Sequence, residues 1–70
     1  MSHIQAVLFN RDYWTVKGSQ DWLDHNGIIP LKRVHVTNNF LRYRIEEPTY
    51  FKRLRTKKLK NGIDLIIGFD

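Results

Sequence analysis

The sequence has no cysteine, only two prolines and no long apolar run. Without cysteine the chain has neither disulfides nor thiolate metal ligands, so its stability has to come from packing. No stretch approaches the roughly 18 apolar residues of a membrane-spanning helix. The N-terminal residues also lack the basic flank, apolar core and cleavage site of a signal peptide. We therefore expect a protein that is not secreted and has no membrane partner.

Acidic residues are also few. Seven Asp and Glu residues face twelve Lys and Arg residues, which gives a net charge of +5. Residues 32–60 hold ten of the basic residues but only two of the acids, so the excess charge is concentrated in one part of the chain. Such asymmetry is typical of a protein with one basic face.

The remaining composition is that of a small globular protein. Hydrophobic residues make up 41% of the chain and aromatic residues 13%, which is too apolar for an intrinsically disordered sequence. A chain of 70 residues allows one domain, spanning residues 1–70, whose core supplies only about 3–5 kcal/mol. Trp14 and Trp22 are expected to form a large part of that core.

The first half of the chain predicts a strand followed by a helix. Residues 3–10 form a short apolar run rich in β-formers, which indicates a strand covered on both faces. Thr15 is a suitable N-cap for an amphipathic helix that begins at Val16. Asn26 and Gly27 are typical of its C-terminal stop.

Residues 33–45 predict a β-hairpin. Asn38 and Asn39 suit the two positive-φ positions of a type I′ turn, and both flanks alternate between apolar and polar residues. This register places Arg33 opposite Arg44 and His35 opposite Arg42.

The C-terminal third predicts a short helix and a second hairpin. Pro48 suits the first turn of a helix that would turn Phe51 and Leu54 inward. Residues 60–62 suit a hairpin loop with Gly62 in a left-handed conformation, which places Lys58 opposite Asp64. We thus expect an α+β fold, a small antiparallel sheet with one main helix in the order β-α-β-β-α-β-β.

The outer face of the first hairpin is the sharpest candidate for a functional site. Like charges directly opposite each other destabilise a sheet unless an anion lies between them. A bound phosphate would provide that anion, with Phe40 as a stacking surface. Alternatively, Asp12, Glu46 or Glu47 neutralises the arginines within the protein.

A second basic stretch follows at residues 52–60. Aromatic residues precede its lysines and arginines, as in surfaces that bind a nucleic-acid backbone. Lysines on an edge strand that prevent aggregation are the alternative interpretation. The residues predicted to bind nucleic acid are Arg33, His35, Phe40, Arg42, Arg44, Lys52, Arg53, Arg55, Lys57 and Lys58.

No pattern in the sequence predicts catalysis. His3, His25 and His35 lie on three different predicted elements and no carboxylates show ligand spacing, so we expect no metal site and no cofactor. The chain has neither a nucleophile and base at a recognisable spacing nor a phosphate-binding glycine loop. We expect no enzymatic activity.

Four segments carry a resemblance over nearly the whole chain: QAVLFN, WTVKGSQDWLDHNG, LKRVHVTNNFLRYRIEEP and FKRLRTKKLKNGIDLIIGF. Their pattern resembles a small basic domain of uncharacterised function in bacteriophages and large DNA viruses, found alone or fused to phage structural or maturation proteins. Ser19 stands where that pattern has alanine, and His35 where it often has an acid. The resemblance implies a viral source, a location inside the host cell or in the virion, and a non-catalytic role.

Two main functions remain open, and a third, an inhibitor of a host nucleic-acid enzyme, would present the same basic face. The first is a module that binds DNA or RNA through its phosphates with little sequence specificity. The second is a minor virion or structural protein, or a homo-oligomer, that docks on an acidic protein surface through its basic face and strand edges.

Overall fold

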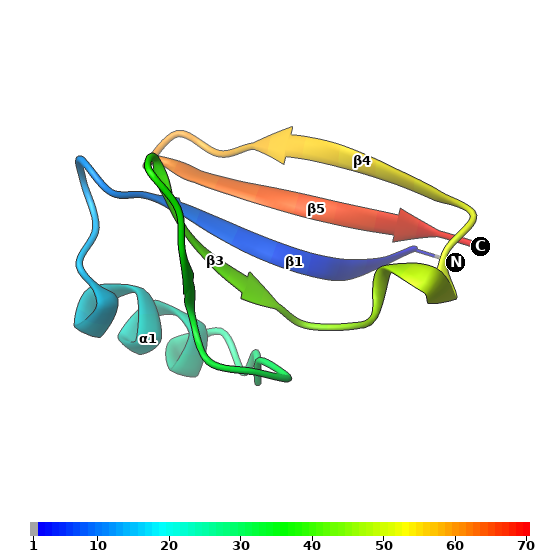
Figure 1. Ribbon diagram of the computed structural model, residues 1–70, viewed down its shortest axis with the longest axis horizontal. Coiled ribbons are helices and arrows are strands. Elements are labelled where there is room, and N and C mark those ends of the chain that lie inside the picture. The colour runs from blue at the N-terminus through cyan, green and yellow to red at the C-terminus, as the bar shows by residue number, and fades with distance from the viewer. Residues whose placement is uncertain (1) are drawn as a thin grey trace.

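The computed structural model describes residues 2–70, which form a five-stranded antiparallel sheet and one α-helix near the N-terminus (Figure 1). The strands lie in the order β2-β3-β1-β5-β4. The elements are β1 (Ser2–Asn10), α1 (Val16–His25), β2 (His35–Val36), β3 (Phe40–Arg44), the 3₁₀ turn η1 (Pro48–Tyr50), β4 (Arg53–Lys58) and β5 (Ile63–Phe69).

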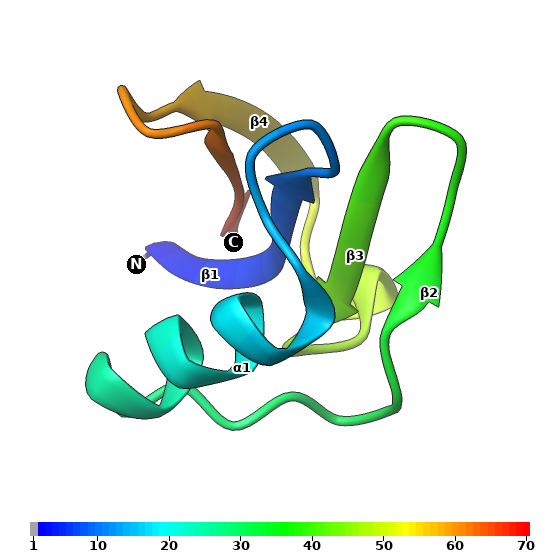
Figure 2. The ribbon, with the colours of Figure 1, turned by 90° about the vertical axis from the view of Figure 1, so that its left-hand side faces the viewer.

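The core lies between α1 and one face of the sheet (Figure 2). Alternate strand residues point to this face, so Val7, Phe9, Leu41, Tyr43 and Ile63 gather there and pack with Leu23 of the helix. The rings of Trp14 and Trp22 lie edge-on to Phe9, with centroids 5.1 and 5.7 Å away. The expectation that the two tryptophans form a large part of the core is met only in part, because both are partly buried and pack against the fully buried residues.

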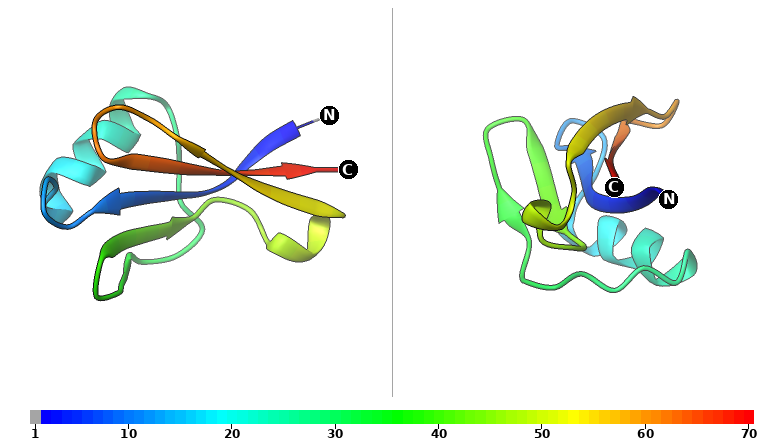
Figure 3. Two further views of the ribbon diagram at one scale, coloured as in Figure 1. Left: turned by 90° about the horizontal axis from the view of Figure 1, so that it is seen from above. Right: turned by 90° about the vertical axis from the view of Figure 1, so that its right-hand side faces the viewer.

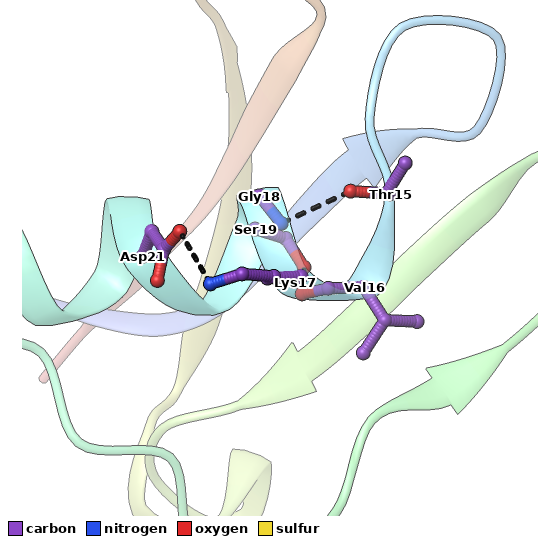
Figure 4. A network of polar contacts seen from close by, with 6 residues as sticks. All are labelled: Thr15, Val16, Lys17, Gly18, Ser19 and Asp21. Carbon is purple, nitrogen blue, oxygen red and sulfur yellow. Dashed lines mark hydrogen bonds and ion pairs between the residues drawn. The ribbon is translucent and has the colours of Figure 1, made fainter.

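The helix begins and ends where the sequence predicts. The Thr15 hydroxyl accepts a hydrogen bond from the Gly18 N–H at 3.0 Å, which satisfies one of the unpaired donors of the first turn (Figure 4). Lys17 and Asp21 form an exposed ion pair one turn apart, at 3.5 Å. Gly27 follows the helix with a φ of 66°, which favours glycine and ends the helix.

A buried polar contact ties the helix to the sheet. The hydroxyls of Ser19 and Tyr43 lie 2.7 Å apart, and Ser19 Oγ also donates to the Val16 carbonyl at 2.7 Å. Tyr43 Oη is therefore the donor to Ser19. Both residues are buried, and the bond fixes α1 against β3.

The second hairpin forms as predicted. Lys58 lies opposite Asp64 in the ladder, although the two side chains form no ion pair within residues 2–70. The Leu59 N–H donates to the Ile63 carbonyl at 2.8 Å, and Gly62 has a φ of 78°. A β-carbon on Gly62 would come within 2.9 Å of the Tyr13 ring, so glycine is required there for space as well.

The first hairpin is shorter than predicted. His35 pairs with Arg42 and Val36 with Leu41, which confirms the register. The type I′ turn is wrong, because no residue other than glycine has a positive φ within residues 2–70. Instead, the Thr37 hydroxyl accepts the Phe40 N–H at 3.0 Å and so holds the turn without a left-handed asparagine.

The pairing of Arg33 with Arg44 is also wrong. The Leu31 N–H donates to the Arg44 carbonyl at 2.8 Å, so the chain rejoins β3 two residues earlier than the predicted register and residues 32–34 leave the ladder. Separating the chains here avoids two like charges in direct opposition.

The predicted second helix is only the 3₁₀ turn η1, with Pro48 in its first turn, so the expected element order is only partly matched. Phe51 follows the turn and packs on Gly68, where an added β-carbon would lie within 2.6 Å of three Phe51 ring atoms. Leu54 was expected inside but is 44% exposed, because it lies on β4 at the edge of the sheet.

The sheet leaves one face without a helix, which we call the open face. Its side chains include Leu8 of β1, Arg42 and Arg44 of β3, and Asp64 and Ile66 of β5, since these are pairing partners or alternate neighbours of one another. A register shift at Gln5 separates Ile4, on the helix side, from Ala6, on the open face. The views in Figure 3 show β4 and β5 extending beyond the part of the sheet that α1 covers.

Candidate nucleic-acid interface

A depression of about 270 Å³ lies beside β3 and is lined only by basic side chains. We call it the basic hollow. Its lining residues are Lys32, Arg33, His35, Arg42 and Arg44. Two of them lie on β3, one on β2, and two in the segment before β2.

The hollow follows from the local path of the chain. Alternation along β3 puts Arg42 and Arg44 on the open face, while Leu41 and Tyr43 enter the core. Opposite them, residues 32–34 bow away from β3 between the bond of Leu31 to Arg44 and the pairing of His35 with Arg42. The space opened by this detour is the hollow. The basic side chains that the sequence predicts in direct opposition therefore lie around a concave site instead.

Internal neutralisation of the hollow is partial. Glu47 Oε2 lies 3.6 Å from Arg44 Nη1, and each side chain is 38% exposed. Glu46 lies beside His3 instead, with its Oε2 atom 3.8 Å from His3 Nδ1. The side chains of Lys32, Arg33 and Arg42 form no ion pair within residues 2–70. One carboxylate therefore offsets one of four Lys and Arg cations.

Phe40 shares the open face with Arg42 and Arg44, since it precedes them on β3 at alternate positions. It pairs with Asn10 of β1 and is half-buried. The structure thus brings an aromatic ring and the arginines to one face of one strand, as the sequence predicts.

The second group of predicted residues lies elsewhere. β4 is at the opposite end of the sheet from β2, and three inter-strand spacings separate it from β3, a distance of about 14 Å. Arg53, Arg55 and Lys57 pair with Phe69, Ile67 and Leu65, which puts them on the helix side of the sheet. Only Lys58 of β4's predicted residues shares the open face. The ten predicted residues therefore do not form one surface.

Two of these arginines lean back on the sheet. The guanidinium carbons of Arg53 and Arg55 lie 5.9 and 6.0 Å from the ring centroid of Phe69. Cation–π contacts of this kind hold the guanidinium groups over the ring without neutralising them. Lys52 precedes β4 and is exposed.

Lys32 lines the hollow but was not among the predicted residues. The sequence signal for it was its position next to Arg33. A regular hairpin would end near that point, so its register assigns Lys32 to neither face of the sheet.

A second depression, of about 290 Å³, lies between α1 and the same irregular segment. Lys32 and Arg33 line it together with Asp24, Tyr43 and other residues. Its lining is mixed in charge and polarity. The basic hollow is therefore the more selective site for an anion.

Within residues 2–70, no three His, Asp or Glu side chains gather in a way that could hold a metal ion. In the same residues, no helix is long and apolar enough to cross a membrane.

Comparisons with family models, curated proteins and solved structures give no match to this chain. The resemblance to a viral domain, the viral source and the location in a host cell or virion therefore stay predictions.

Proposed function

We propose that this protein is a non-catalytic module that binds nucleic acid by its phosphates, with little sequence specificity, through the basic hollow. The observation that carries the proposal is the convergence of five basic side chains around one concave site in which, among residues 2–70, a single carboxylate, Glu47, contacts one of them. Arginine forks match phosphate oxygens in a bidentate manner, and cations from several segments can surround one phosphate group.

The neighbouring surface supports a nucleic acid over an isolated small anion. Phe40 lies on the same face and strand as Arg42 and provides a ring on which an unpaired base can stack. Contacts to phosphates position a nucleic acid but carry no sequence information. We accordingly expect single strands to bind at least as tightly as duplexes of the same charge.

The proposal is tested by titrating fluorescent single-stranded and double-stranded oligonucleotides across a salt series. Each phosphate contact contributes about −0.7 to −0.9 to the slope of log affinity against log salt, so several contacts predict a slope of about −3 or steeper. The double variant Arg33→Gln/Arg42→Gln removes two cations from the hollow, and the slope should then become shallower by about 2 units.

The matched control is Arg55→Gln/Lys57→Gln, which removes the same charge from β4. Its effect on affinity should be under about threefold, because exposed charges more than about 10 Å away are screened at ordinary salt. Equal losses in the two double variants would contradict the assignment to the hollow. Absence of binding at low salt would overturn the proposed function itself.

A further inference from the structure

A second surface, independent of the proposed function, lies along the edge of the sheet at β4. Its six residues are all exposed, and within residues 2–70 β5 is its only pairing partner (Figure 1). The opposite edge strand, β2, has only two residues. β4 is therefore the long open edge of this sheet.

The backbone of β4 is regular enough to pair with another strand. Its register with β5 runs without interruption from Arg53 to Lys58. The Leu59 N–H donates inward to Ile63, and antiparallel ladders alternate inward and outward groups. The N–H and C=O groups of Leu54, Thr56 and Lys58 consequently point to the open edge, where they are available to a new strand.

The side chains of β4 determine which charge a strand added at this edge must carry. Arg53, Arg55 and Lys57 lie on one face, and Leu54, Thr56 and Lys58 on the other. None of the four cations of β4 forms an ion pair within residues 2–70. The contacts of Arg53 and Arg55 with Phe69 leave their charges unneutralised.

We propose that β4 pairs with an extended acidic segment of a partner protein. The segment carries Asp or Glu at alternate positions, beside Arg53, Arg55 and Lys57, and apolar or small residues beside Leu54 and Thr56. Opposite charges across neighbouring strands stabilise the pairing, and the backbone ladder supplies the remaining affinity.

A second copy of the chain is the wrong occupant for this edge. Antiparallel pairing of β4 with itself about Arg55 would put Arg55 beside Arg55 and Arg53 beside Lys57. Like charges in direct opposition destabilise a sheet, and basic edge strands are a known means of preventing self-association. The same charges that oppose a homodimer therefore favour an acidic strand.

The experiment titrates the full chain with a short peptide of alternating Glu and Val and monitors binding by amide hydrogen exchange of the protein. Binding should raise the protection of the Leu54, Thr56 and Lys58 amides and leave those of Arg53, Arg55 and Lys57 nearly unchanged. The same peptide with N-methyl groups on the amides of one edge keeps its charge but cannot form the ladder. It should bind at least about tenfold more weakly.

Thr56→Pro provides the matching test on the protein. It removes an N–H that points to the open edge, so the β4–β5 ladder keeps its bonds while the added strand loses one. Peptide affinity should fall about tenfold, with little change in oligonucleotide binding at the hollow. If this variant does not fold, Arg55→Gln/Lys57→Gln replaces it. This double variant should bind the Glu-Val peptide more weakly but leave the affinity for a Gln-Val peptide unchanged.

Equal binding of the methylated and unmethylated peptides, or protection changes without the predicted alternation, would overturn strand pairing and leave only a diffuse charge effect. No binding of the Glu-Val peptide at low salt would also overturn it. Concentration-dependent dimerisation through β4 would show that a second copy is the occupant and contradict the proposal. None of these results bears on nucleic-acid binding at the hollow.

Discussion

The basic hollow and the β4 edge carry similar charge but differ in shape. In the hollow, side chains from β3, β2 and the preceding loop converge on one concave site, and the local backbone leaves the ladder. Along β4, the cations alternate on a regular strand whose backbone faces outward. A convergent site suits a compact anion such as phosphate, whereas a regular open edge suits another extended chain. Charge alone does not distinguish these two surfaces.

The largest effect is expected from a substitution in the core, because both surfaces depend on it. Phe9 is fully buried and touches Trp14, Trp22 and Tyr43. Phe9→Ala should lower the free energy of unfolding by about 3–5 kcal/mol, which is comparable to the whole stability of so small a domain. Urea unfolding followed by circular dichroism measures this, and both surfaces should be lost together. Tyr13→Ala, at a residue 76% exposed, is the control.

A smaller change should disturb the β4 side more than the hollow. At Gly68, a β-carbon would approach the Phe51 ring to 2.4 Å, so the ring and the chain leading into β4 have to move. Gly68→Ala should destabilise the fold by about 1–3 kcal/mol. Amide exchange should increase along β4 before it increases at β3. Unchanged stability would show that Phe51 does not depend on this glycine.

The hydrogen-bonded hydroxyl pair between α1 and β3 should stabilise the side of the molecule that carries the basic hollow. Tyr43→Phe removes the donor to Ser19 and should cost about 1 kcal/mol in stability, as should Ser19→Ala. The two changes should be non-additive by about 0.5–1 kcal/mol in a double-mutant cycle. Additive effects would mean that the buried hydroxyls do not stabilise the contact between helix and sheet.

The smallest effect concerns the carboxylate at the hollow. Glu47→Gln removes the partner of Arg44 and should raise oligonucleotide affinity about two- to threefold, while stability changes by less than about 1 kcal/mol because the pair is partly exposed. Asp21→Asn, which removes an acid from the exposed face of α1, is the matched control and should have a weaker effect. Weaker oligonucleotide binding by Glu47→Gln would show that Glu47 positions Arg44 for the ligand.

Strong local signals predicted most of the fold. Thr15, Gly27 and Gly62 mark the ends of a helix and a hairpin, and each has the expected role. The alternation of residues 40–45 identified both faces of β3. These features depend on near neighbours in the chain, which the sequence displays directly.

Other features depended on interactions between distant segments. The bond from Leu31 to Arg44 and the Thr37 hydroxyl decide the length and turn of the first hairpin, and neither follows from residue periodicity. The predicted binding residues fall into two separate groups for a similar reason. Residues 33–44 and 52–58 are both basic, but only the strand order reveals that they lie toward opposite edges and mostly on opposite faces.

The most direct test of the separation between these two surfaces is to follow the backbone amide signals of the isotope-labelled protein during titration with a short single-stranded oligonucleotide. We predict that the first shifts occur around the hollow, at Lys32, Arg33, His35, Arg42 and Arg44, with Phe40 beside them, and that β4 responds only at higher ligand concentration. First shifts along Arg53–Lys58, or simultaneous shifts of equal size at both edges, would contradict the assignment of phosphate binding to the hollow.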